Sequence, residues 1–203
     1  MSNVDEDIKV ALLGDEGVGK TSIISSYCNI NLKESMASYG KKIIKVRDKT
    51  VELNLWDTAG EEKFISLGKN FYRNAFIVCL VYDITNKESF ENLKTKWYKE
   101  LKKNGEKNTI LAVVGNKSDL YEKGEVEEDE AIEFAEKIGA TFQLTSPLNN
   151  GGDLERFFKT LVEKYFSSEF RFRPEFIERN QRRAESFKLG KEKTAEYCKK
   201  GCC

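Results

Sequence analysis

The segment that most constrains this sequence is a glycine-rich run of eight residues between an apolar stretch and a helical pattern. Its residues are, in order, Gly14, Asp15, Glu16, Gly17, Val18, Gly19, Lys20 and Thr21. Residues 8–13 before it are apolar enough for a buried strand, and residues 19–28 after it have helical spacing. Glycines at these positions let backbone N–H groups turn toward phosphate oxygens, and the lysine adds a positive charge. The sequence therefore predicts a phosphate-binding loop, because an ordinary glycine turn would not explain both flanking elements.

Apolar runs and helical patterns alternate along the rest of the chain. We expect strands at residues 8–13, 41–47, 50–56, 75–82, 110–114 and 141–144, and helices at residues 19–28, 63–73, 87–104, 127–138 and 154–166. Only Asp48 and Lys49 separate the second and third strands, which indicates an antiparallel hairpin. The alternation predicts an α/β protein with a six-stranded, mostly parallel sheet, one antiparallel hairpin and helices on both faces. Together with the phosphate-binding loop, this architecture indicates the P-loop NTPase fold.

A second polar motif follows the apolar run at residues 110–114. It consists of Asn116, Lys117, Ser118 and Asp119, and it falls at the carboxyl end of a strand, where parallel sheets bind ligands. The Asp119 carboxylate can accept two parallel hydrogen bonds from guanine, whereas adenine offers no such pair of donors. By itself this motif is a common polar turn, but together with the phosphate-binding loop it predicts recognition of guanine.

A third motif, residues 56–60, ends the predicted strand at residues 50–56. Asp57 can hold Mg²⁺, which Thr21 can also ligate, and the backbone N–H of Gly60 can approach a γ-phosphate. Loss of that phosphate would release the segment that follows. The motif therefore predicts a nucleotide-dependent switch.

These three motifs, in this order, resemble the Ras superfamily. Residues 56–64, 71–75 and 80–85 are similar to signatures of its Rab branch, as are Trp97 and the terminal Gly201-Cys202-Cys203. The resemblance covers residues 7–166 and the last three residues. It implies a GTPase that binds GTP or GDP with Mg²⁺ and regulates vesicle traffic on the cytoplasmic face of endomembranes, cycling with the cytosol. It also implies GTP-dependent effectors, an exchange factor, an activating protein, a prenyl-transfer escort and a GDP-dissociation inhibitor as partners.

The C-terminal segment differs from the rest of the chain in charge. Residues 167–203 contain ten Lys or Arg against six Asp or Glu, a net charge of +4, which leaves residues 1–166 at 24 against 28, or −4. We expect a GTPase domain at 1–166 and a flexible tail at 167–203, in which Cys202 and Cys203 carry prenyl groups. The acidic body argues against nucleic acid as a partner, and the basic tail favours anionic lipid.

The composition excludes several other kinds of site. The chain has five cysteines and no histidine, so neither a disulfide framework, a Cys/His metal site nor a histidine-activated nucleophile is expected. Cys28 and Cys79 lie among apolar neighbours and are predicted to be buried. No stretch has the length of a membrane span, and the polar N-terminus lacks the pattern of a secretion signal.

Four residues depart from the family pattern. Glu61 replaces the glutamine that orients the attacking water, and Glu16 stands at a position that is usually small. With Lys20 and Glu61 as the catalytic candidates, we expect slow hydrolysis, because a carboxylate offers no N–H to the transition state. Near the base, Leu32 replaces a stacking aromatic residue, and Pro147, which follows Ser146, has no N–H to donate. We therefore expect weaker guanine binding or faster exchange than is usual in the family.

The stretch between Lys20 and Asp57 is about five residues shorter than in typical Rabs, so two hydroxyls in it are candidates for contact with Mg²⁺. Ser38 is the candidate for contact with Mg²⁺ and γ-phosphate, and Ser35 is its rival.

Two functions rival the switch. A non-catalytic adaptor with a GTPase fold, locked with GTP or binding nucleotide weakly, would fit the four departures. An ATP-using kinase would fit the phosphate-binding loop but not the motif at residues 116–119.

Overall fold

A computed structural model of the protein describes residues 4–30, 39–57, 72–105, 109–148 and 152–167. The chain divides into two units, Met1–Lys164 and Tyr165–Cys203. The sheet and the candidate site belong to the first unit. The predicted helix at residues 63–73 falls almost entirely outside the described residues, and so does the tail.

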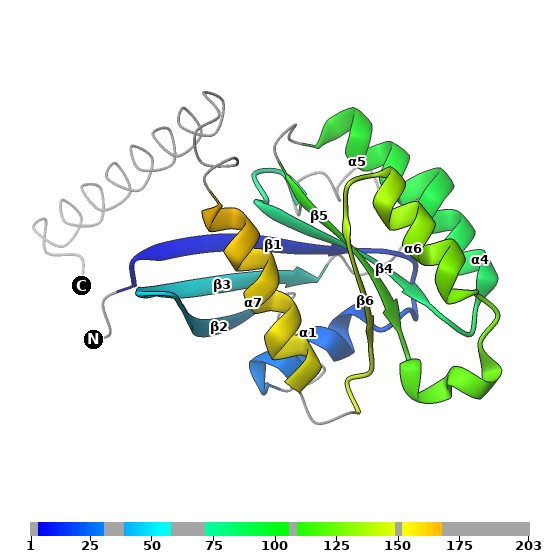
Figure 1. Cartoon of the computed structure of the whole chain (residues 1–203), viewed down its shortest axis with the longest axis horizontal. Coiled ribbons are helices and arrows are strands. Elements are labelled where there is room, and N and C mark those ends of the chain that lie inside the picture. The colour runs from blue at the N-terminus through cyan, green and yellow to red at the C-terminus, as the bar shows by residue number, and fades with distance from the viewer. Residues whose placement is uncertain (1–3, 31–38, 58–71, 106–108, 149–151, 168–203) are drawn as a thin grey trace, which may run out of the picture. The chain divides into compact units, whose positions relative to one another are not determined.

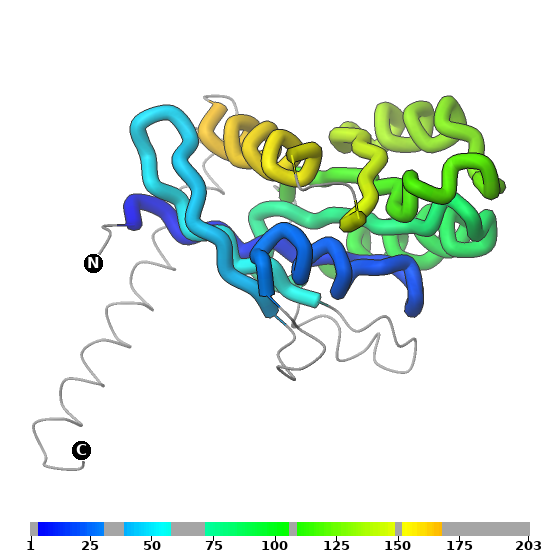
Figure 2. Tube along the Cα trace, turned by 90° about the horizontal axis from the view of Figure 1, so that it is seen from below, coloured from blue at the N-terminus to red at the C-terminus, as the bar shows by residue number. Residues whose placement is uncertain are grey.

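The described strands form one sheet of six (Figure 1). They are β1 (Glu6–Leu13), β2 (Tyr39–Val46), β3 (Lys49–Asp57), β4 (Ile77–Asp83), β5 (Ile110–Asn116) and β6 (Thr141–Thr145). Their order across the sheet is β2-β3-β1-β4-β5-β6, in which β2 and β3 pair antiparallel and all other neighbours pair parallel. Figure 2 shows the β2–β3 hairpin as the cyan loop. The predicted sheet, with its single hairpin, is therefore confirmed.

The helices in the described ranges agree with those expected there except at two places. They are α1 (Lys20–Cys28), α4 (Lys87–Asn92), the π-helical turn η2 (Leu93–Trp97), α5 (Tyr98–Asn104), the 3₁₀ turn η3 (Ser118–Lys123), α6 (Glu128–Lys137) and α7 (Gly152–Phe166). The helix expected at residues 87–104 is present, but η2 interrupts its α-helical hydrogen bonding. The turn η3 was not predicted, because Leu120 and Tyr121, its two apolar residues, are adjacent and give no helical apolar spacing.

Both faces of the sheet are covered by helices, as predicted. On one face, apolar side chains of β1, β4 and β5 form a core cluster with residues of α4, η2, α5 and α6. On the other face, Tyr27 of α1 stacks on Phe158 of α7 with ring centroids 4.3 Å apart. Cys28 and Cys79 are buried, as expected. Every residue of β4 is buried, which is why this central strand is continuously apolar up to its last residue, Asp83.

The parallel strands bring polar residues to one edge of the sheet. Asp57, Asp83, Asn116 and Thr145 end β3, β4, β5 and β6. Asp83 is the register partner of Asn116, which is in turn the partner of Thr145. Since β1 leads directly into the phosphate-binding loop, that loop lies at the same edge. Among the described helices, none is long and apolar enough to cross a membrane.

Candidate functional site

Two glycines fix the shape of the phosphate-binding loop. Gly14 has φ +153°, and a Cβ there would lie 2.1 Å from the carbonyl oxygen of Val81. Gly19 has φ +96°, and a Cβ there would lie 2.2 Å from Nδ2 of Asn116. Neither position has room for a side chain. Between them, Gly17 and Glu16 are exposed, whereas Val18 is buried.

Lys20 is the first residue of α1, and its ammonium group is held inside the phosphate-binding loop. Nζ donates to the carbonyl oxygens of Gly14 at 2.9 Å and Asp15 at 2.7 Å, and the residue is only 4% exposed. Burial lowers the pKa of Lys20, while the nearby carboxylates of Asp57, Asp15 and Glu16 oppose that shift. A buried, charged lysine beside a loop of backbone amides can bind phosphate oxygens.

Thr21 and Asp57 meet beside this lysine. The Thr21 hydroxyl donates a short hydrogen bond to Oδ2 of Asp57, so an alcohol oxygen and a carboxylate oxygen lie side by side. The first turn of α1 contains no acidic residue, so its positive end is left for a ligand. In the described parts of the chain, no group of three or more His, Cys, Asp or Glu could hold a metal by itself. Thr21 and Asp57 instead fit Mg²⁺, which usually takes one or two carboxylates together with substrate phosphates and water.

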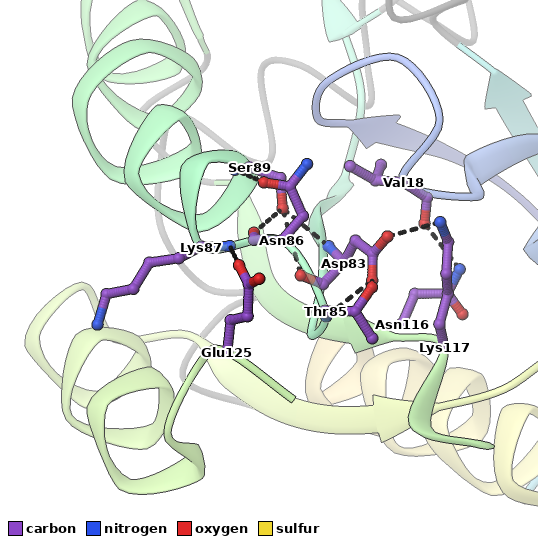
Figure 3. A network of polar contacts seen from close by, with 9 residues as sticks. All are labelled: Val18, Asp83, Thr85, Asn86, Lys87, Ser89, Asn116, Lys117 and Glu125. Carbon is purple, nitrogen blue, oxygen red and sulfur yellow. Dashed lines mark hydrogen bonds and ion pairs between the residues drawn. The ribbon is translucent and has the colours of Figure 1, made fainter. Parts of the chain in front are cut away.

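Three side-chain contacts join the base-recognition loop, residues 116–119, to its neighbours, and Figure 3 draws the first two, those of Asn116 and Lys117. Nδ2 of Asn116 donates to the carbonyl oxygen of Val18 at 2.8 Å, which ties the end of β5 to the phosphate-binding loop. Nζ of Lys117 lies 2.5 Å from Oδ2 of Asp83 at the end of β4. Lys117 has φ +65°, so the chain turns sharply there before η3 begins.

The third contact joins the base-recognition loop to the segment after β6. The Ser146 hydroxyl donates to Oδ1 of Asp119 at 2.5 Å. Ser146 is 3% exposed, whereas Asp119 is exposed. The carbonyl oxygen of Pro147 accepts a 3.2 Å hydrogen bond from the Ser26 hydroxyl of α1. The predicted residues Asp119, Ser146 and Pro147 are thus brought to the same part of the site.

Two buried polar atoms at this edge have no partner among the described residues. They are Oδ1 of Asn116 and Oγ1 of Thr145, on neighbouring strand ends in register. Buried polar atoms in folded proteins are rarely left without a hydrogen bond. Their position therefore fits a polar ligand or an ordered water beside the base-recognition loop.

The structure places most, but not all, of the predicted site residues. The phosphate-binding loop, Asp57, the base-recognition loop, Ser146 and Pro147 lie along one edge of the sheet. The other predicted site residues lie outside the described ranges. They are the switch hydroxyls Ser35 and Ser38, Leu32 at the base-stacking position, Gly60 near the γ-phosphate, Glu61 at the position that orients water, and the lipidation residues Cys202 and Cys203. For these residues the sequence predictions stand as predictions.

Sequence reasoning missed two groups that support the site. Asp83 was not predicted as a partner for Lys117, although an acidic residue at the end of an entirely apolar strand is a usable signal. Asn92 and Trp97 were not expected to contact the phosphate-binding loop, yet both donate to the Asp15 carboxylate. No sequence signal connects residues about eighty positions apart in this way.

This fold and this site define a class: an α/β nucleotide-binding domain built around a phosphate-binding loop. Comparison with known proteins narrows the class. The model of the Ras family matches residues 9–167. Ras-related protein Rab-31 of Rattus norvegicus is 41% identical over 148 residues, which cover 70% of this chain and 75% of that protein. Ras-related protein RABA4b of Arabidopsis thaliana is 35% identical over 170 residues, covering 81% and 75%.

The chain belongs to the Ras family and is a Rab-like small GTPase. The predicted membership of the Ras superfamily and the predicted fold class are confirmed. GTP hydrolysis is supported as the activity because the family consists of GTPases. Guanine-nucleotide binding is likewise supported by membership of this family.

Proposed function

We propose that this protein is a GTP-dependent switch in membrane traffic, which binds guanine nucleotide and Mg²⁺ at the carboxyl edge of its sheet. The observation that carries the proposal is the 2.8 Å hydrogen bond from the Asn116 amide to the Val18 carbonyl. This bond joins the loop expected to bind phosphate to the loop expected to bind the base. One nucleotide could therefore contact both loops at once.

The proposal gives each group of site residues a role in binding the nucleotide. Backbone amides of residues 14–19 and the ammonium of Lys20 bind the phosphates. Asp119 accepts two hydrogen bonds from guanine, and its contact with Ser146 orients the carboxylate. Asn116 holds the base-recognition loop against the phosphate-binding loop. Ser38 and Gly60 are proposed to contact the metal and the γ-phosphate from the switch segments.

Mg²⁺ would be held by Thr21 and Asp57, whose oxygens are already in contact. When bound, the ion would neutralise charge on the phosphates. The chain's own contribution is to present one hydroxyl and one carboxylate at the start of α1, next to Lys20. Lys20 would then bind phosphate oxygens beside the two residues that would hold the metal.

Calorimetry with GDP and GTP in the presence of Mg²⁺ tests nucleotide binding, with ATP as the comparison. We expect uptake of both guanine nucleotides and little uptake of ATP. Asp119→Asn should shift the preference toward xanthine nucleotides, because the amide pairs with a ring carbonyl rather than an amine. Asp129→Asn, on the exposed surface of α6, is the matched control. Unchanged GTP binding in Asp119→Asn would contradict the assignment of the base.

We propose further that hydrolysis is slow. Glu16 is exposed on the phosphate-binding loop, where its carboxylate would lie near the phosphates or an activating partner, and Glu61 stands where a water-orienting amide is expected. Single-turnover hydrolysis by the purified protein measures the rate directly. A rate typical of the family would contradict this part of the proposal and the adaptor alternative, whereas absence of turnover with tight GTP binding would favour the adaptor.

The membrane role is proposed from the tail. Cys202 and Cys203 would carry prenyl groups, and Lys199 and Lys200 would add attraction to anionic lipid on the cytoplasmic face of endomembranes. Effectors would bind the GTP state, which an exchange factor would form by releasing GDP and an activating protein would end by promoting hydrolysis. A prenyl-transfer escort and a GDP-dissociation inhibitor would handle the lipidated form. Mass spectrometry of the native C-terminal peptide should show the added isoprenoid mass, and unmodified cysteines would contradict the anchor.

A further inference from the structure

One side chain of the phosphate-binding loop is held from outside the loop. Nδ2 of Asn92 donates to Oδ2 of Asp15 at 2.7 Å, and Nε1 of Trp97 donates to Oδ1 at 2.6 Å. Both oxygens of the carboxylate are therefore engaged by a single helical segment. Trp97 is 6% exposed, so its indole N–H has little access to water and needs this acceptor.

The π-helical turn explains how two residues five positions apart reach one carboxylate. Residues i and i+5 of an α-helix point about 140° apart, because each residue turns the helix by about 100°. In η2 the N–H of Tyr98 instead bonds to the carbonyl of Leu93, five residues earlier. This wider turn brings side chains at i and i+5 closer to the same face. Asn92 precedes the turn and Trp97 is its last residue, so both side chains can face Asp15.

The same residue, Asp15, also holds the buried lysine. Its backbone carbonyl accepts the 2.7 Å hydrogen bond from Nζ of Lys20, while its side chain is bound by Asn92 and Trp97. A buried ammonium group is stable only where fixed acceptors compensate for lost water. Fixing the Asp15 side chain therefore restricts the carbonyl that keeps Lys20 in place.

We propose that Asn92 and Trp97 are positioning residues that clamp the phosphate-binding loop through Asp15 and thereby slow the release of bound nucleotide. They act through Asp15 and Lys20. The identity of the ligand, a guanine nucleotide, rests on the proposed function. The clamp itself rests on the contacts of the three side chains and on the π-helical turn that aligns two of them.

Release of fluorescently labelled GDP from the full chain tests the clamp. Trp97→Phe keeps an aromatic ring in the core but removes the N–H donor together with some buried volume, and Asn92→Ala removes the other donor. We expect each change to accelerate release about tenfold, which corresponds to about 1.4 kcal/mol. Asp15→Asn should also accelerate release, and adding Trp97→Phe to it should add little, because the two residues form one contact.

A packing control separates positioning from general loosening. Leu101→Val, in the same helical segment, removes buried apolar volume without touching the phosphate-binding loop. It should lower the thermal stability of the protein and leave release unchanged. Equal acceleration by Leu101→Val and Trp97→Phe would overturn the proposal, as would unchanged release in both Trp97→Phe and Asn92→Ala.

Hydrogen exchange distinguishes failure of the clamp from failure of the proposed function. If the unaltered protein takes up no GDP, the proposed function is wrong. The clamp is then tested by the hydrogen-exchange rates of the backbone amides of residues 14–19. Faster exchange there in Trp97→Phe than in Leu101→Val supports the clamp. Equal exchange in the two variants overturns it.

Discussion

The Lys117 ammonium lies 2.5 Å from the carboxylate of Asp83, so an ion pair joins the base-recognition loop to the neighbouring strand β4. Asp83 is 6% exposed. Its other oxygen accepts hydrogen bonds from the backbone N–H and the hydroxyl of Thr85, at 2.9 and 2.8 Å (Figure 3). A buried carboxylate with this set of partners holds Lys117 in one position, although that lysine is itself partly exposed.

We expect Asp83→Asn to weaken GDP binding about fivefold to tenfold. The amide can still accept from Thr85, but it no longer attracts the Lys117 ammonium, and a charged hydrogen bond contributes about 1 to 3 kcal/mol before solvent screening reduces it. Calorimetry measures the change. Thr85→Val, which removes only the hydroxyl contact on the far oxygen, should have a smaller effect. If Thr85→Val weakens binding as much as Asp83→Asn does, the ion pair is not what positions the loop.

Gly19→Ala should reduce guanine-nucleotide affinity by about tenfold or more. A methyl group there would lie 2.2 Å from Nδ2 of Asn116, and φ +96° strains any residue with a Cβ by about 1 to 2 kcal/mol. Both loops of the site would have to move apart. Gly139→Ala is the matched control, because Gly139 also has positive φ, +68°, but a Cβ there meets nothing within 4 Å. That variant should lose stability and keep its affinity, and equal affinities in the two variants would exclude the clash as the cause.

The sequence predicted the parts of this site that are contiguous in the chain. The phosphate-binding loop and residues 116–119 were identified because strand ends, glycine spacing and polar residue types occur together within a few positions. The pairing of Asp83 with Lys117 and the hydrogen bonds to the Asp15 carboxylate were not predicted, because they depend on which side chains meet after the sheet and helices have packed. Likewise, the apolar spacing of residues 87–104 predicts a helix but not its π-helical turn, since one widened turn leaves the overall pattern unchanged.

We expect the protein to lose stability in alkali because Cys28 and Cys79 are buried thiols. Burial raises the pKa of Cys28 to about 11 and that of Cys79 to about 12, from an ordinary value of 9.0. The unfolded chain would lose these protons near pH 9 while the folded chain keeps them. The contribution of these two thiols to the free energy of unfolding is therefore complete below about pH 9 and is lost as the pH rises toward 11 and 12.

Urea unfolding at a series of pH values measures this loss. Cys79→Ala should lower the free energy of unfolding at neutral pH, because it leaves a small cavity. It should also reduce the fall in stability above pH 9, because one buried thiol no longer titrates. A fall of the same steepness in both proteins would mean that Cys79 does not contribute to it.

Glu61→Gln should accelerate GTP hydrolysis about tenfold or more. The substituted amide can donate an N–H toward the transition state and orient the attacking water, and it removes a negative charge from the neighbourhood of the γ-phosphate; single donors of this kind commonly change rates by about 100-fold or more. Single-turnover hydrolysis with saturating Mg²⁺ measures the effect. Glu62→Gln removes the same charge one residue further along the chain, so it separates charge from position. If both variants accelerate hydrolysis equally, the cause is reduced repulsion of the phosphates, and position 61 has no particular role in orienting water.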